Sequence, residues 1–205
     1  MSVIYKRGSA GRAVARIQRA LHICPDGKYG PLTEEAVREF QAVNKIAVDG
    51  ICGVRTLMLL GMVSLLPKSK RYINEIIVHC TATPAGKDYT VDDIRRWHLQ
   101  RGFSDIGYHY VIYRDGTVHE GRSVDIAGAH CEGHNTHSIG VCYVGGVQRN
   151  GKTPSDTRTN AQRAAMLNLL FELREAYPNA KIHGHRDYAA KACPSFDATT
   201  EYKGL

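Results

Sequence analysis

Three side chains in this sequence combine residue type and position in a way that suits a metal ion. His79 ends a short apolar run of strand type, His185 follows a second such run, and Cys193 comes eight residues after His185. Two imidazoles and one thiolate, delivered by strand ends and a loop, could occupy three corners of a zinc tetrahedron and leave the fourth to water, as catalytic zinc requires. Spacing alone leaves other combinations open, which include His183, His109 and Cys142.

The elements that must position these side chains follow from the pattern after Ile73. Apolar runs of strand type alternate there with helical patterns, which predicts an α/β fold with a mixed central β-sheet flanked by helices. Strands are expected at 73–80, 108–113, 117–119, 138–144 and 180–183. Thr90 and Thr159 each precede a helical pattern with Asp or Gln three positions later, as in a capping box. The Gly- and His-rich residues 121–137 lack periodicity, which is typical of a functional loop.

An internal repeat marks the amino-terminal part of the chain. The pattern D-G-x-x-G-x-x-T begins at Asp26 and again at Asp49, an offset of 23 residues. Each copy is interpreted as a glycine-rich turn whose Thr lies at a helix start. Val14, Ile17 and Leu21 recur at i, i+3 and i+7, the stripe of an amphipathic helix. We expect about three short helices over residues 3–62.

Composition restricts the class of protein less than these patterns do. The net charge of +7 favours polyanionic partners, which include nucleic acid, acidic lipid and the bacterial wall. The six cysteines are scattered without a CxxC pair, which favours reduced thiols in a cytosolic setting. The start of the chain lacks the apolar core of a signal peptide, and the run from Leu57 to Leu66 is too short to span a bilayer.

Residues 1–62 resemble the small helical peptidoglycan-binding domain. The matching pieces are Val14-x-x-Ile17-Gln18-x-x-Leu21, Ala36-Val37-x-x-Phe40-Gln41 and the two repeats. The resemblance implies wall binding, although some such modules serve only as spacers. Residues 63–72 mix a proline, serines and basic residues, so we interpret them as a linker before a catalytic domain at 73–205.

Six motifs in order over residues 76–197 resemble the amidase family of the phage lysozymes and the animal peptidoglycan recognition proteins. They are Ile77-Val78-His79-Cys80-Thr81, Ile94-x-x-Trp97-His98, Gly107-Tyr108-His109 with Arg114-Asp115-Gly116, Gly121-Arg122, Asn135-x-x-Ser138-Ile139-Gly140, and Lys191-Ala192-Cys193-Pro194-Ser195-Phe196-Asp197 after His185. The resemblance implies hydrolysis of the amide bond between N-acetylmuramic acid and L-alanine in peptidoglycan.

The resemblance also selects the site residues. It implies that His79, His185 and Cys193 hold one zinc ion per chain, and that Tyr108 and Lys191 complete the catalytic site. Zinc would lower the pKa of a bound water towards ~7. Which of Tyr108 and Lys191 handles the proton stays open. His130 and Asn135, in the long loop, match positions that line the substrate groove.

Two other classes of function remain to be weighed. Some relatives bind muropeptides without cutting them and typically lose the cysteine ligand, whereas Cys193 is present here. A nucleic-acid binder is motivated only by the charge, and no motif of that class is found. We therefore expect bacterial peptidoglycan as partner, no nucleic acid, no stable membrane insertion and a monomer. We expect cytoplasmic synthesis and action on the wall after release or delivery, as an endolysin of phage or bacterial origin.

Overall fold

The computed structural model describes residues 4–62, 66 and 68–205. The chain divides into two compact units, Met1–Leu65 and Leu66–Leu205, and each is described by itself. The described residues contain no helix that is both long and apolar enough to cross a membrane.

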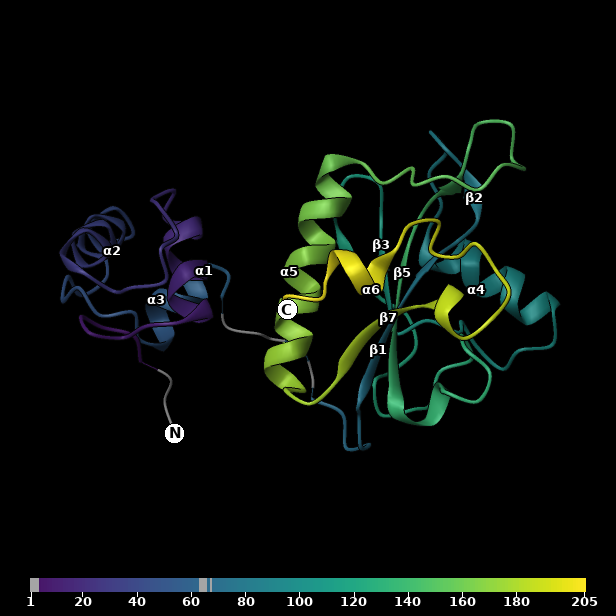
Figure 1. Ribbon diagram of the computed structural model, residues 1–205, viewed down its shortest axis with the longest axis horizontal. Helices are drawn as coiled ribbons and strands as arrows, with labels where there is room; N and C mark the ends of the chain where they lie inside the picture. Colours follow the sequence, from purple (N-terminus) through teal and green to yellow (C-terminus); the bar gives the residue numbers. More distant parts are fainter. Residues whose placement is uncertain (1–3, 63–65, 67) are drawn as a thin grey trace. The chain divides into compact units, whose positions relative to one another are not determined.

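The first unit is helical within its described residues, as the repeat and the apolar stripe predict. Its helices are α1 (Arg12–Ala20), α2 (Pro31–Val43) and α3 (Val54–Leu59) (Figure 1). They pack on a small core in which Val14, Ile17 and Val37 have no exposed surface. Thr33 and Thr56 lie in the first turns of α2 and α3, so the Thr of each repeat is at a helix start.

Two buried glutamines hold the repeated turns in the same way. Gln18 Nε2 lies 2.7 Å from Asp26 Oδ1 and 2.9 Å from Thr33 Oγ1, while its Oε1 accepts from the Gly27 backbone N–H at 2.8 Å. Gln41 makes the equivalent bonds to Asp49, Thr56 and the Gly50 backbone, each 23 residues later. Gly27 and Gly50 have φ of 71° and 70°, a conformation that favours glycine. We call this arrangement the glutamine staple.

The second unit is built on a five-stranded sheet with the order β4-β3-β5-β1-β7. The strands are β1 (Glu75–Cys80), β3 (Tyr110–Ile112), β4 (Val118–Glu120), β5 (Ser138–Tyr143) and β7 (Lys181–Gly184). β4 pairs antiparallel with β3, and the other neighbours are parallel, so the predicted mixed sheet is confirmed. A second, two-stranded sheet joins β2 (Thr83–Pro84) to β6 (Gly146–Val147).

Helices cover both faces of the sheet (Figure 1). α5 (Asn160–Ala176) buries Met166, Leu170 and Leu173 against one face. α4 (Val91–Gln100) packs Ile94 in a separate cluster with Val111 of β3, so it covers the opposite face. The predicted capping boxes at Thr90 and Thr159 are both present. The remaining helical segments are short: the 3-10 turns η1 (Asn135–His137) and η2 (His185–Asp187), and α6 (Ala198–Glu201).

The second half of the predicted linker is part of the second unit. Ser69 N donates to the Tyr177 hydroxyl at 2.6 Å, and Ser69 Oγ donates to Val124 O at 2.6 Å. Arg71 donates to the backbone carbonyls of Val124 (2.8 Å) and three residues in or beside η1, which are Asn135, Thr136 and Ser138. Residues 63–65 and 67 of the predicted linker lie outside the described residues.

Candidate metal centre and active site

The sheet brings two of the predicted metal ligands to the same edge. β1 and β7 are parallel neighbours in a register that pairs Val78 with Gly184. His79 and His185 each follow that pair by one residue, so both lie beside each other at the carboxyl edge, and their ring centroids are 4.6 Å apart. A histidine at the end of a buried strand and another after its neighbour therefore meet because of the parallel pairing.

A loop held by several hydrogen bonds positions the third predicted ligand. Cys193 Sγ lies 3.7 Å from His79 Nδ1 and accepts from the Cys80 backbone N–H at 3.3 Å. Arg186 N donates to Cys193 O at 2.7 Å, and the Tyr143 hydroxyl donates to Pro194 O at 2.7 Å. These bonds, made from both sides of the loop, hold the thiol in place. Cys80 itself packs in the core on the other face of β1, as strand alternation predicts, and its thiol lies beside that of Cys193 at the strand end.

The ligand atoms of His79, His185 and Cys193 all lie within 4.8 Å of one another. Within the described ranges, no other group of three His, Cys, Asp or Glu side chains is arranged in this way. The alternative candidates lie in other surroundings. His183 Nδ1 is 3.9 Å from Asp187, and His109 Nδ1 accepts from the Gly140 backbone N–H at 2.9 Å.

The electrostatics of the three side chains suit a bound cation. Burial, with the neighbouring His130, lowers the pKa of His79 well below its ordinary value, and burial with Lys191 lowers that of His185. Both rings are therefore neutral near pH 7 and offer a lone pair. The Cys80 thiol and burial raise the pKa of Cys193, so a thiolate at this position needs a compensating positive charge.

The two predicted catalytic residues both lie near the predicted metal ligands. The Tyr108 ring centroid is 5.2 Å from that of His79, and burial raises the pKa of its phenol well above the ordinary value. Lys191 is exposed and lines a cavity of about 510 Å³ together with His185. Lys191 is two residues from Cys193, so the same loop places both.

The two residues predicted to bind substrate line the same cavity but are engaged within the protein. Asn135 Oδ1 accepts from the backbone N–H groups of His130 (2.8 Å) and Cys131 (3.0 Å), which closes the loop on itself. His130 is 8% exposed, and its Nδ1 lies 3.0 Å from His79 Nε2. Substrate contact by either residue stays a prediction.

Sequence reasoning missed a polar bridge between two segments that line the cavity. Glu75 accepts from the Tyr188 hydroxyl at 2.7 Å and lies 2.9 Å from His134 Nδ1. The rings of His134 and Tyr188 stack with centroids 3.8 Å apart. Glu75 begins β1, and its partners are 59 and 113 residues away, so no local pattern could reveal the bridge.

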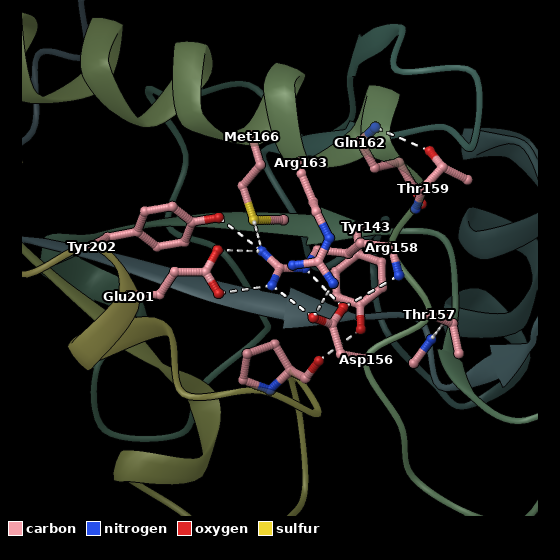
Figure 2. A network of polar contacts seen from close by, with 12 residues as sticks. Tyr143, Asp156, Thr157, Arg158, Thr159, Gln162, Arg163, Met166, Glu201 and Tyr202 are labelled. Carbon is pink, nitrogen blue, oxygen red and sulfur yellow. Dashed lines mark hydrogen bonds and ion pairs between the residues drawn. The ribbon is translucent and has the colours of Figure 1, made fainter.

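The buried Arg158 contacts the loop that carries Cys193. Figure 2 shows the Arg158 guanidinium between Asp156 on one side and Glu201 and Tyr202 on the other, with all three bonded to it at 2.8–3.0 Å. Its central carbon lies 3.3 Å from the ring centroid of Phe196, three residues after Cys193. This network joins the segment before α5 to the loop and to α6.

The comparisons with known proteins agree with this architecture. The N-acetylmuramoyl-L-alanine amidase family matches residues 69–196, and the chain belongs to that family. A peptidoglycan binding domain family matches residues 10–60. The resemblances predicted from the sequence are therefore confirmed for both parts of the chain.

The chain is similar to several phage endolysins. The endolysin of Enterobacteria phage K11 is 48% identical over 124 residues, which are 60% of this chain and 82% of the phage protein. The endolysin of Escherichia phage T7 is 43% identical over 130 residues, 63% of this chain and 85% of that protein.

Solved structures of amidases and recognition proteins share the fold. The N-acetylmuramoyl-L-alanine amidase LysC from Clostridium intestinale URNW superposes with a TM-score of 0.54 at 29% identity, covering 64% of this chain and 83% of its own. Wild-type PGRP-LB of Drosophila has a TM-score of 0.55 at 27% identity, covering 70% and 89%.

Proposed function

We propose that this protein is a zinc-dependent N-acetylmuramoyl-L-alanine amidase that acts on bacterial peptidoglycan as an endolysin. The bond cleaved is the amide between the lactyl group of N-acetylmuramic acid and L-alanine. The observation that carries the proposal is the convergence of His79, His185 and Cys193 within 4.8 Å at one edge of the sheet. Membership of the amidase family supports the substrate class.

The donor set fits zinc. Two imidazole nitrogens and one sulfur suit zinc, whereas magnesium and calcium prefer oxygen ligands. Zinc held there would polarise the scissile carbonyl and make water more acidic, with a pKa of ~7. One thiolate and two neutral imidazoles leave one positive charge on a divalent site, which opposes the negative charge that develops during amide hydrolysis.

Tyr108 can act as a hydrogen-bond donor. Burial raises the pKa of its phenol, so the hydroxyl keeps its proton at neutral pH and can donate it to an oxygen of the water or substrate. Its position beside His79 is suited to this role, because the ring lies next to a proposed ligand without belonging to the donor set.

Lys191 stabilises the oxyanion from the open side of the site. It is exposed on the cavity wall, where an ammonium group can meet the substrate as it enters. A preorganised donor aimed at a developing oxyanion is worth ~3 kcal/mol in the transition state. Asn135 shapes the same wall through its bonds to the backbone of the loop.

The first unit holds the enzyme on its substrate. We propose that residues 1–62 bind the wall and that residues 73–205 carry the catalytic groups, with Ser69 and Arg71 of the joining segment belonging structurally to the catalytic part. All three proposed metal ligands come from one chain, so a monomer is sufficient for catalysis. Similarity to the phage endolysins supports action on the wall after release or delivery from the cytoplasm.

The test is a digest of purified peptidoglycan with metal analysis of the same preparation. We expect new amino-terminal L-alanine, about one zinc per chain as the three-ligand site implies, and loss of release after chelation. New reducing sugar ends in place of amino termini would identify a glycosidase and exclude the proposed reaction. Wall binding without metal and without turnover would identify a recognition protein.

A further inference from the structure

The two ring nitrogens of His79 face different partners. Nδ1 lies 3.7 Å from Cys193 Sγ, on the side of the converging donors, and Nε2 lies 3.0 Å from His130 Nδ1. A neutral imidazole carries one proton and one lone pair on its two nitrogens. A ligand that offers Nδ1 must therefore keep its proton on Nε2, and the group placed to accept that proton is His130 Nδ1.

The same logic extends to His130. Because its Nδ1 accepts, its own proton lies on Nε2, which is 3.4 Å from Ser138 Oγ. His79 and Ser138 have no exposed surface and His130 has 8%, so water does not compete for these bonds. A directed series of hydrogen bonds then runs from His79 through His130 to Ser138.

Packing holds the His130 ring in the orientation that this series needs. Its backbone N–H donates to Asn135 Oδ1 at 2.8 Å. A Cβ at Gly140 would lie 2.5 Å from His130 Cδ2, and one at Gly128 would also collide with the ring. Glycine at both positions therefore leaves room for the ring close to the backbone, and this close packing restricts rotation of the ring.

We propose that His130 is a positioning residue that sets the tautomer and ring plane of His79, so that Nδ1 is prepared to bind the metal ion. This inference rests on the proposed zinc site. It differs from the substrate contact that the family resemblance implies, because a substrate contact alters the Michaelis constant while a positioning residue alters metal affinity. Removal of such a hydrogen-bond partner costs ~10–100-fold in metal affinity.

Two substitutions at His130 separate the hydrogen bond from the bulk of the ring. His130→Leu removes the acceptor, whereas His130→Asn keeps an oxygen at the position of Nδ1, the same number of bonds from Cα. Zinc affinity is measured by competition with a chromophoric chelator. We expect His130→Leu to bind zinc ~10–100-fold more weakly and His130→Asn to remain close to the unaltered protein.

His109 provides a matched control. It has no exposed surface, and its ring centroid is 5.6 Å from that of His130, but its ring nitrogens contact the Gly140 and Ile126 backbone and the Arg71 side chain rather than His79. His109→Leu should lower stability and leave the zinc affinity of the folded protein unchanged. Equal weakening by His109→Leu and His130→Leu, or by both His130 variants, would show a general packing effect and overturn the inference.

Nitrogen NMR of the histidine rings tests the same point without any substitution. In the zinc-loaded protein we expect both His79 and His130 to be protonated on Nε2. A proton on His130 Nδ1 would overturn the positioning role while leaving the zinc site in place. If the unaltered protein binds no zinc at all, the proposed function fails first, and the inference fails with it.

Discussion

The first unit and the second unit both bury polar side chains, but they satisfy them differently. In the glutamine staple, the amide groups of Gln18 and Gln41 find donors and acceptors on all sides, and the arrangement repeats after 23 residues. In the second unit, one ring nitrogen of His79 is bonded to His130, and the other faces the side chains of Cys193 and His185.

The difference separates structure from chemistry. A buried polar group whose bonds are all internal stabilises a turn, because leaving it unpaired would cost free energy. Buried nitrogen and sulfur atoms that converge on a common point with unshared lone pairs need a further partner, such as a cation. By this criterion we interpret the histidine and cysteine group as a candidate metal site and the glutamine staple as structural support.

The strongest test of this contrast is Cys193→Ser. A hydroxyl is a poorer zinc ligand than a thiolate, so we expect zinc to be lost on dialysis. Peptidoglycan cleavage should fall by more than ~100-fold, which exceeds the usual effect of removing a residue that only hydrogen-bonds to a metal ligand. Metal analysis and amino-terminal L-alanine release measure the two effects. Cys24→Ser, at an exposed position in the first unit, is the control and should change neither. Full activity of Cys193→Ser would remove the site assignment.

A pair of deletions tests where the second unit begins. Removing residues 1–62 should weaken sedimentation with cell walls and spare cleavage of small soluble muropeptides. Removing residues 1–72 also removes Arg71, whose bonds hold the backbone around η1, and should lower the stability of the second unit by at least about 3 kcal/mol, because several hydrogen bonds from a charged donor are lost.

The single tryptophan makes this comparison direct. Trp97 lies in α4 of the second unit, so its fluorescence follows the unfolding of that unit alone. Arg71→Met in the full chain is the matched variant and should reproduce most of the loss. Equal stability of the two deletions would mean that the segment from 63 to 72 is a simple linker after all.

Local signals predicted most of the fold, and long-range contacts explain what they missed. Capping boxes at Thr90 and Thr159 and the short apolar runs are patterns of a few residues, so helices and strands could be placed from them. Arg71 looked like part of a basic linker because its acceptors are more than fifty residues away. His130 could be placed near the site only by family resemblance, and the direction of its ring depends on how the loop folds.

The glutamine staple gives the corresponding prediction for the first unit. Gln41→Leu removes every bond made by the amide group and leaves the backbone N–H of Gly50 without its acceptor. We expect the first unit to lose about 2 kcal/mol of stability, seen as a shift of one calorimetric transition of the full chain. Wall sedimentation should decrease, and activity on soluble muropeptides should not. Gln148→Leu, at an exposed position, is the control. A loss of zinc in Gln41→Leu would contradict the purely structural role assigned to the glutamine staple.

Substitution of Arg158 has the smallest expected effect on stability, because the carboxylates bonded to it are partly exposed to solvent. The Arg158 side chain has no exposed surface, but Asp156 and Glu201 keep 22% and 39% of theirs. Once freed, these carboxylates can be hydrated again, so Arg158→Met should cost about 1–2 kcal/mol rather than the ~3–5 kcal/mol of a fully buried pair.

The pH dependence of stability distinguishes this network from simple packing. Burial acts to raise the pKa of Asp156 and Glu201, but bonds to Arg158 outweigh it and hold both below their ordinary values of 3.8 and 4.5. A carboxylate with a lowered folded-state pKa stabilises the protein above its unfolded pKa and loses that contribution as the pH falls through the folded value. Tryptophan-monitored stability should therefore fall below about pH 4.5, and less steeply in Arg158→Met. Arg163→Met, which removes a more exposed partner of Asp156, should change the slope less. Identical slopes in all three proteins would show that Arg158 contributes only its bulk against Phe196.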